Sequence, residues 1–250
     1  MSSTSTRPIE LIPTVQILGT PISTLDMEQT LEQLQKWIRE DTPRLVITAD
    51  ATALVIAEEK PRFQEVLHKA SLITADSVGV IWAMKRAGVK SPSKVSGVEI
   101  VDRLCEISSR TGIKLYFIGS EPGITDRAAE KMRLKYPGVN IVGTHHGFFP
   151  ADSDEVVAQE IARTQPDVIF AAMGMPRQEE FILRTMEITR AKIGMGVGGS
   201  FDVFSGKTKR APKLLQALRL EWLWRLMLNP SKISKVKSLP KFVRLILTRS

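Results

Sequence analysis

The sequence has very little cysteine: Cys105 is the single thiol among 250 residues. One thiol excludes an internal disulfide framework and any metal site built from several cysteines. Cys105 ends the apolar segment 101–105, where a free cysteine is expected to pack as a small buried hydrophobic residue. The sequence therefore predicts a structural thiol at this position.

Long apolar runs are also missing. No segment approaches the roughly 18 uninterrupted apolar residues of a membrane-spanning helix. The opening MSSTSTRPIE lacks the apolar stretch of a secretory signal, so we expect a cytoplasmic protein. With 43% hydrophobic and 25% charged residues, the composition is that of a folded globular chain and excludes wholesale disorder.

Acidic residues are scarce in the last fifth of the sequence. Residues 201–250 contain 12 Lys/Arg and only two acids, Asp202 and Glu221, a net charge of +10. Residues 1–200 have a net charge of −2, so the overall charge of +8 comes from the C-terminal segment. The two parts are therefore expected to meet different partners.

Short β-branched runs alternate with helical patterns at a spacing of roughly 25 residues. This alternation predicts an α/β fold with a mostly parallel, Rossmann-like sheet and helices on both faces. The predicted strands are 14–18, 44–48, 72–74, 114–118, 140–142, 167–172 and 192–195. The predicted helices are 27–39, 78–87, 99–110, 125–135, 154–164 and 178–189, the first with a capping box of Asp26 and Gln29.

The pattern changes after Gly206. Pro212 is typical of a first helical residue, and the predicted helix runs to about Leu228 with apolar residues on nearly all sides. Such a helix must pack on protein or lipid, which indicates self-association or membrane contact. Beyond it, 231–250 has six Lys/Arg and apolar residues at helical spacing, interrupted by Pro240. We predict a body of about 1–205 and a helical, basic, membrane-proximal appendage of about 206–250.

Small, polar and charged residues follow the predicted strands at their carboxyl ends, where open parallel sheets bind ligands. These segments are 48–50, 76–79, 119–123, 174–179 and 196–202. The loop Gly119–Gly123 has the glycines of a phosphate-binding turn that opens a helix, although an ordinary strand-to-helix turn has the same composition. Gly194, Gly196 and Gly199 spell G-x-G-x-x-G but follow the last strand, so a close-packed turn is favoured over a dinucleotide site.

Metal ligands are few. Asp152 and Asp154 follow Pro150 at the start of a predicted helix, which is typical of N-terminal capping. His68 stands alone, and His145 and His146 are adjacent, a spacing at which two side chains rarely bind one metal ion. We therefore expect neither a metal site nor a cofactor.

A series of motifs resembles the WecG/TagA/CpsF family of glycosyltransferases over about residues 15–230. The motifs occur in the family's order, which makes the resemblance specific. They are Thr48-Ala49-Asp50, Ala75-Asp76-Ser77-Val78-Gly79, Lys94–Glu99, Tyr116–Ser120, Gly143–Phe149, Gly174–Glu179, Gly196–Asp202, Arg210-Ala211-Pro212 and Leu220–Leu226 with Pro230.

The resemblance implies an inverting transfer of an N-acetylmannosamine-type sugar from a UDP-sugar to a polyprenyl-diphosphate-linked acceptor, without metal, in cell-surface polysaccharide synthesis. Asp76 matches the family's proposed base, which would deprotonate the acceptor hydroxyl. Thr48 matches a pocket threonine. The resemblance also implies binding roles for Arg177, Gln178 and Asp202. Asp50, Gly119, Ser120 and Gly199 are further substrate-binding candidates, because they follow strands at the same edge.

Two positions depart from the family's pattern: Asp50 stands where asparagine is usual and Ser77 where glycine is usual. A second carboxylate near Asp76 would raise one of the two pKa values if both point into the crevice. These departures leave the identity of the sugar open.

The implied acceptor accounts for the basic appendage. Lys and Arg favour both a diphosphate and an anionic membrane surface, and Trp222 and Trp224 suit the interface. Arg210, Arg219 and Arg225 are diphosphate-binding candidates, although Arg225 could instead brace its helix by pairing with Glu221. We expect peripheral association with the inner face of the cell membrane.

Two other classes of protein share part of these features. A nucleotide-binding protein with a nucleic-acid-binding tail would also be basic at its C-terminus, but the tail contains no recognisable DNA- or RNA-binding module. An NAD-dependent oxidoreductase would share the sheet, but the glycine fingerprint is in the wrong context. We therefore expect no nucleic-acid partner.

Overall fold

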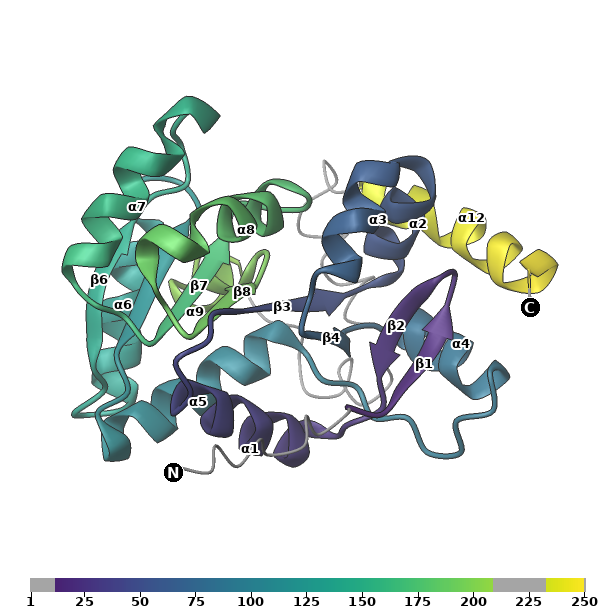
Figure 1. Cartoon of the computed structure of the whole chain (residues 1–250), viewed down its shortest axis with the longest axis horizontal. Helices are drawn as coiled ribbons and strands as arrows, with labels where there is room; N and C mark the ends of the chain where they lie inside the picture. Colours follow the sequence, from purple (N-terminus) through teal and green to yellow (C-terminus); the bar gives the residue numbers. More distant parts are fainter. Residues whose placement is uncertain (1–11, 209–232, 250) are drawn as a thin grey trace, which may run out of the picture.

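The computed structural model describes residues 12–208 and 233–249, which form a parallel α/β sheet covered by helices and a separate antiparallel hairpin (Figure 1). The strands are β1 Thr14–Ile17, β2 Thr20–Ser23, β3 Arg44–Ala49, β4 Leu72–Ala75, β5 Leu115–Gly119, β6 Ile141–His145, β7 Val168–Ala172 and β8 Ile193–Gly196. The helices are α1 Met27–Ile38, α2 Ala51–Glu59, α3 Pro61–His68, α4 Val78–Arg86, α5 Gly97–Thr111, α6 Ile124–Lys135, the short 3-10 turn η1 Ala151–Ser153, α7 Asp154–Arg163, α8 Arg177–Thr189, α9 Ser200–Phe204 and α12 Ile233–Arg249.

The main sheet has six parallel strands in the order β4-β3-β8-β7-β5-β6, so all six carboxyl ends lie along one edge. The connection after β5 leads outward to β6, whereas the connection after β7 leads the opposite way to β8. Ligands of open α/β sheets bind where neighbouring connections diverge in this way. The topology therefore places a crevice between the ends of β5 and β7.

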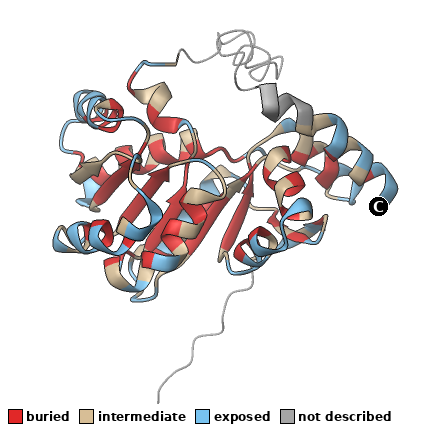
Figure 2. Ribbon diagram, turned by 90° about the horizontal axis from the view of Figure 1, so that it is seen from above, coloured by how far each residue is buried: buried red, intermediate tan, exposed pale blue. Residues whose placement is uncertain are grey.

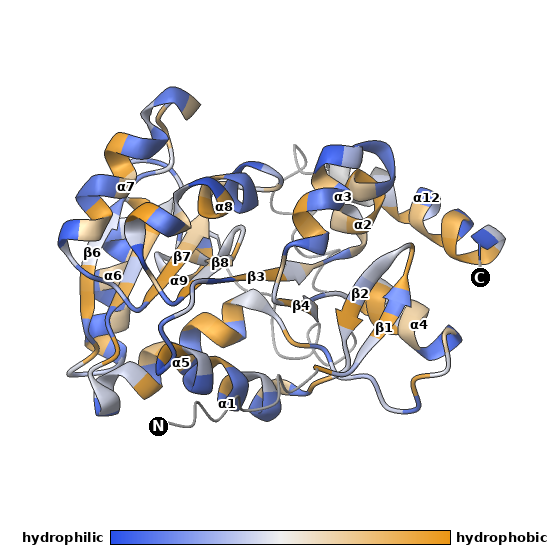
Figure 3. Ribbon diagram, in the orientation of Figure 1, coloured by the Kyte–Doolittle hydropathy of each residue, from blue (hydrophilic) through white to orange (hydrophobic). Residues whose placement is uncertain are grey.

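Alternate residues of each strand face opposite sides of the sheet, and both sides are covered. Leu45 and Ile47 of β3 join a buried cluster with α2, α3, α4, α7, α8 and α12. Val46 faces the other way, into a cluster with α1, α5, α6 and α9. In Figure 1, α2, α3 and α8 lie above the sheet and α1 and α5 below it. Figure 2 shows the buried strands between these layers, and Figure 3 shows that the covering helices alternate hydrophilic and hydrophobic residues.

The predicted α/β class and all seven predicted strands are confirmed, within one to three residues at their ends. Three features were not predicted, one of them the short helix α9 after β8. β2 pairs with β1 outside the main sheet, and α2 and α3 fill the connection from β3 to β4. α2 has no amphipathic pattern because its residues are buried on several sides, including Ala51, Leu54 and Ala57. A helix of this kind cannot be recognised by a single apolar stripe.

Two local predictions are confirmed. The Asp26 side chain accepts a hydrogen bond from Gln29 N, and the Gln29 side chain accepts one from Asp26 N, which is the predicted capping box of α1. Cys105 is fully buried in the cluster below the sheet. Burial raises the pKa of its thiol far above the ordinary value, as expected for a structural rather than a reactive cysteine.

The C-terminal helix α12 packs against α2 and α4, at the end of the molecule farthest from β6 (Figure 1). Phe242 and Ile246 are buried in this contact, and Leu239 and Phe242 lie over Gly79 of α4. The expected interruption at Pro240 does not occur, since the helix continues through an exposed Pro240. The predicted helix 212–228 lies outside the described residues, as do Arg210, Arg219 and Arg225. The predicted division near residue 205 stays a prediction.

Along residues 12–208 and 233–249, no helix combines the length and the apolar content that crossing a bilayer requires.

Candidate active site

The N-termini of three helices meet at the carboxyl ends of β3 and β4. Asp50 caps α2 by accepting a hydrogen bond from Ala53 N at 2.9 Å. Ser77 caps α4 by accepting from Val80 N at 3.3 Å, and it also accepts from Ala51 N of α2 at 3.2 Å. Asp76 accepts from Gly97 N, the first residue of α5, at 3.2 Å. Because helix N-termini carry partial positive charge, this corner of the molecule favours anions.

Thr48 connects this corner to the end of β8. Its hydroxyl donates to the carbonyl oxygen of Gly196 at 3.2 Å. A Cβ on Gly97 would lie 3.2 Å from the Thr48 Oγ1, so the first turn of α5 passes close to Thr48. Asp76 and Thr48 are therefore neighbours across Gly97, and both are half-buried.

Gln178 extends the same group of residues from α8. Its side chain is buried, and its Oε1 accepts hydrogen bonds from Gly174 N at 3.2 Å and Gly198 N at 3.1 Å. The loop after β7 and the loop after β8 are thus held by one amide group. A Cβ on Gly196 would lie 2.6 Å from Gln178 Nε2, which places Gln178 directly against the strand end that Thr48 contacts.

Glu179 is part of this group, although the sequence analysis selected only its two predecessors as binding residues. Its side chain is 1% exposed, and its Oε1 accepts a hydrogen bond from Gln178 Nε2 at 2.7 Å. Burial raises the pKa of Glu179 to about 7, the hydrogen bond from Gln178 opposes this rise, and the nearby charge of Asp50 adds to it. The sequence does contain a signal for Glu179, since it is an acid in the first turn of a helix at the ligand-binding edge. Acids at this position are common because they stabilise the start of a helix, so the signal is not specific for a binding site.

The two departures from the family's pattern, Asp50 and Ser77, both have structural partners. Each caps a helix, and Ser77 joins the starts of α2 and α4. The expected effect of Asp50 on Asp76 stays a prediction. The charge of Asp50 does raise the pKa of another carboxyl group, that of Glu179. An extra hydroxyl at position 77 is accommodated because two N–H groups require an acceptor there.

The loop Gly119–Gly123 follows β5 and lies against the end of β7. Ser120 N donates to Ala172 O at 2.8 Å, and Ser120 O accepts from Gly147 N at 2.9 Å. A Cβ on Gly119 would lie 2.5 Å from the Ala172 backbone. Close packing on β7 thus explains Gly119 without a ligand, and the expected role of Gly119 and Ser120 in substrate binding stays a prediction. α6 follows this loop, with no side chain capping its N-terminus.

The glycines of the G-x-G-x-x-G pattern allow α8 to lie close to β8. A Cβ on Gly194 would lie 2.2 Å from Ile182 Cγ2, and one on Gly196 would meet Gln178 and Glu179. Gly199 precedes α9, and Asp202 lies in the first turn of that short helix, with its carboxylate near Gly199. The expected close packing is confirmed for Gly194 and Gly196, but both residues lie within strand β8 and not in a turn. Binding roles for Gly199 and Asp202 stay predictions.

Arg177 is directed away from this group of residues. It donates from Nη1 to Asp154 Oδ2 at 2.9 Å and lies over the rings of Phe149 and Phe181. Arg184 pairs with the same buried carboxylate. Asp154 therefore pairs with two arginines. It does not cap α7, because no side chain makes a capping hydrogen bond at the start of that helix. A contact between Arg177 and phosphate would require this pairing to change, so that role also stays a prediction.

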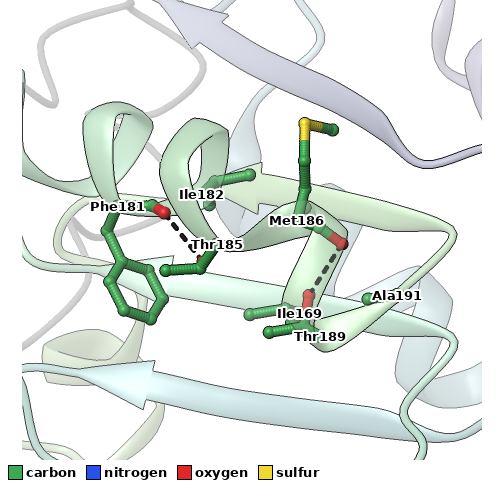
Figure 4. Close-up of a pocket in the computed structure, with 8 residues that line it drawn as sticks. Ile169, Phe181, Ile182, Thr185, Met186, Thr189 and Ala191 are labelled. Atoms are coloured by element: carbon green, nitrogen blue, oxygen red, sulfur yellow. Dashed lines mark hydrogen bonds between the residues drawn. The ribbon is translucent and has the colours of Figure 1, made fainter. Parts of the chain in front are cut away.

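A small cavity of about 10 Å³ lies between α8 and β7, away from these polar residues. Figure 4 shows Phe181, Ile182 and Met186 around it, with the hydroxyls of Thr185 and Thr189 bonded to carbonyls of their own helix. A space of this size holds one water molecule at most. Among the described residues, no three His, Cys, Asp or Glu side chains gather as they would around a metal ion.

The structure thus brings four of the predicted residues together: Thr48, Asp50, Asp76 and Gln178. With Glu179, they lie at the ends of β3 and β4 and at the start of α8, which packs against the end of β8. Fold and site together define a class, an α/β enzyme with a carboxylate at the ligand-binding edge of a parallel sheet.

The chain belongs to the family described as "Glycosyl transferase WecG/TagA/CpsF family", whose sequence model matches residues 15–250. It is therefore a glycosyltransferase. Two relatives, from Bacillus spizizenii and Staphylococcus aureus, are both named N-acetylglucosaminyldiphosphoundecaprenol N-acetyl-beta-D-mannosaminyltransferase. The first is 31% identical, covering 84% of this chain and 81% of the relative. The second is 30% identical, covering 92% of this chain and 90% of the relative.

Proposed function

We propose that this glycosyltransferase moves an N-acetylmannosamine-type sugar from a UDP-sugar to a polyprenyl-diphosphate-linked acceptor sugar, with inversion at the anomeric carbon, in cell-surface polysaccharide synthesis. The names of the two relatives support the sugar and the acceptor. The observation that carries the proposal is the position of Asp76 at the meeting point of three helix N-termini, with Thr48 beside it.

In this mechanism Asp76 is the base. The acceptor hydroxyl attacks the anomeric carbon, its proton passes to Asp76, and the bond to the UDP oxygen breaks with its electron pair leaving on UDP. One displacement inverts the anomeric configuration. The N–H of Gly97 holds Oδ2 of Asp76 in place at the ligand-binding edge.

The leaving diphosphate carries negative charge that must be neutralised. The partial positive charges at the starts of α2, α4 and α5 supply part of the compensation. We assign the rest to Arg210, Arg219 and Arg225 and to the backbone N–H groups of the Gly119–Gly123 loop, so no metal ion takes part. The fixed dipoles are in place before the reaction, which is the condition for effective charge stabilisation.

The acceptor's lipid explains the uneven charge of the chain. A polyprenyl chain lies in a membrane, and the +10 segment 201–250 is suited to an anionic membrane surface. In α12 the apolar residues Phe242 and Ile246 contact the body, while Arg244 and Leu247 are exposed. We propose peripheral attachment through the appendage, with α12 holding it to α2 and α4.

The direct test is transfer by the purified protein from a small set of UDP-sugars to a lipid-diphosphate-linked N-acetylglucosamine. We expect product from UDP-N-acetylmannosamine or a close relative and thermal protection by UDP but not by NAD. Protection by NAD, or salt-dependent binding of nucleic acid without any sugar transfer, would contradict the proposal.

A further inference from the structure

Glu179 is a buried acid with an incomplete set of partners. Its Oε1 accepts from Gln178 Nε2, whereas its Oε2 is buried and has no hydrogen-bond partner among the described residues. Burying a carboxylate with so few partners costs folding free energy. Such a group in a folded protein requires an explanation.

The neighbours of Glu179 indicate what it holds in place. Gln178 Oε1 faces two N–H donors, Gly174 N and Gly198 N, while its Nε2 faces the Glu179 carboxyl group. If the amide turned by half a rotation, its NH₂ would face two donors and its oxygen would face the carboxyl oxygen. Glu179 and the two glycine N–H groups therefore select a single orientation of the amide.

The space around the pair is closed. Gly196 leaves room for both side chains, because a Cβ there would lie 2.6 Å from Gln178 Nε2 and 2.7 Å from Glu179 Oε1. The carbonyl of Gly196 accepts the Thr48 hydroxyl on the other side. A shift of the Gln178 amide would therefore disturb both loops and the strand end beneath Thr48.

We propose that Glu179 is a positioning residue of the transferase site. It holds the Gln178 amide so that the loop after β7 and the loop after β8 stay joined, and the joined loops keep the Thr48 side of the site shaped for the donor sugar. The effect on sugar transfer rests on the function proposed above, whereas the joining of the two loops does not.

The charge state of Glu179 adds a pH dependence. Burial raises its pKa to about 7, hydrogen bonds from Gln178 and from its own backbone N–H lower it, and the charges of Asp50 and Glu180 raise it. Arg177 and Arg184 on the same helix pair with Asp154, and Arg62 of α3 faces Glu180. An ionised carboxylate accepts a stronger hydrogen bond than the neutral acid. Because burial nevertheless raises the pKa, ionisation disfavours the buried, joined arrangement relative to an opened one. The connection between the loops should therefore loosen as the pH rises through about 7.

Hydrogen exchange of the Gly174 and Gly198 amides, without substrate, tests the connection in Glu179→Ala, Glu179→Gln and the matched control Glu180→Gln. At pH 6 we expect Glu179→Ala to lower the protection factors of both amides about tenfold, the equivalent of one lost hydrogen bond, and Glu180→Gln to leave them unchanged. Between pH 6 and 8, protection should fall in the wild type, because Glu179 ionises in its buried position, and stay constant in Glu179→Gln. Wild-type protection in Glu179→Ala would overturn the proposal. If Glu179→Ala does not fold, the pH dependence of Glu179→Gln decides.

Steady-state kinetics with a varied UDP-sugar test the consequence for the site. We expect Glu179→Ala to raise the donor KM about tenfold with a smaller effect on kcat, and Glu179→Gln to restore the KM. Unchanged kinetics in Glu179→Ala would overturn the positioning role. If no UDP-sugar is used by the wild type, the proposed function fails, while the exchange measurement still decides whether Glu179 joins the loops.

Discussion

The N–H of Gly97 donates a hydrogen bond to Oδ2 of Asp76 across 3.2 Å, which joins the loop after β4 to the first residue of α5. The other potential cap of α5, Ser96, makes no side-chain cap bond. Asp76 therefore serves two purposes, since it completes the start of a 15-residue helix and presents a carboxylate at the ligand-binding edge.

Asp76→Asn should lower kcat for sugar transfer at least about 10²-fold, because an amide cannot accept the hydroxyl proton. UDP binding should be kept, since the amide oxygen still accepts from Gly97 N. Radiolabelled sugar transfer and calorimetric titration with UDP measure the two effects. Asp102→Asn, a partly exposed position on α5 that pairs with Lys135, is the control. A kcat within threefold of the wild type would remove Asp76 as the base.

Ser77→Ala should lower the free energy of unfolding by about 1–2 kcal/mol, because the N–H groups of Val80 and Ala51 lose their acceptor. Urea unfolding at neutral pH measures the change. Thr111→Ala, which removes an exposed hydroxyl near the end of α5, should change it by less than about 0.5 kcal/mol. Equal effects of the two substitutions would show that Ser77 does not join α2 to α4.

Glu179→Gln should stabilise the protein at pH 8 and have little effect on stability near pH 4.5. The folded-state pKa of about 7 lies above the ordinary value of 4.5, so the wild-type acid contributes stability at low pH that is lost as the pH rises through 7. The difference at pH 8 should reach about 3 kcal/mol at most. Urea unfolding of both proteins at several pH values tests this. A stability difference that does not change with pH would contradict the prediction.

Deletion of the residues after about 230 should weaken binding to anionic liposomes and lower activity on a long-chain lipid acceptor, because the deletion removes six Lys/Arg. Phe242→Ala separates charge from packing, since it removes a buried ring worth about 2 kcal/mol from the contact with α4 and keeps every basic residue. We expect it to expose α12 to proteolysis while most liposome binding persists. Unchanged liposome binding and activity after the deletion would refute the membrane role.

Activity should be insensitive to EDTA, because the proposed mechanism neutralises the leaving diphosphate with arginines and helix N-termini. The measurement is the initial rate of transfer after dialysis against the chelator, with and without added Mg²⁺ or Mn²⁺. A rate that collapses with EDTA and returns with a divalent cation would show that a metal ion takes part.

The sequence predicted the elements of the fold better than their contacts. Its apolar periodicity is local, and it identified the strands and most helices of the body. It did not predict α2, because a helix covered by the sheet, α3 and α12 has no polar face to mark it. It also did not separate β1 and β2 from the main sheet, since pairing between strands is a long-range property.

The same distinction applies to the site. The sequence by itself determined which residue types follow each strand, and parallel strands necessarily bring those residues to one edge. Only the tertiary structure decided which of them touch. It turned Arg177 toward Asp154, made Asp50 and Ser77 helix caps, and buried Glu179 beneath Gln178. Hydrogen bonds and burial depend on how α8, β8 and the starts of α2, α4 and α5 are placed in space. No local pattern in the sequence shows which of these elements will be neighbours.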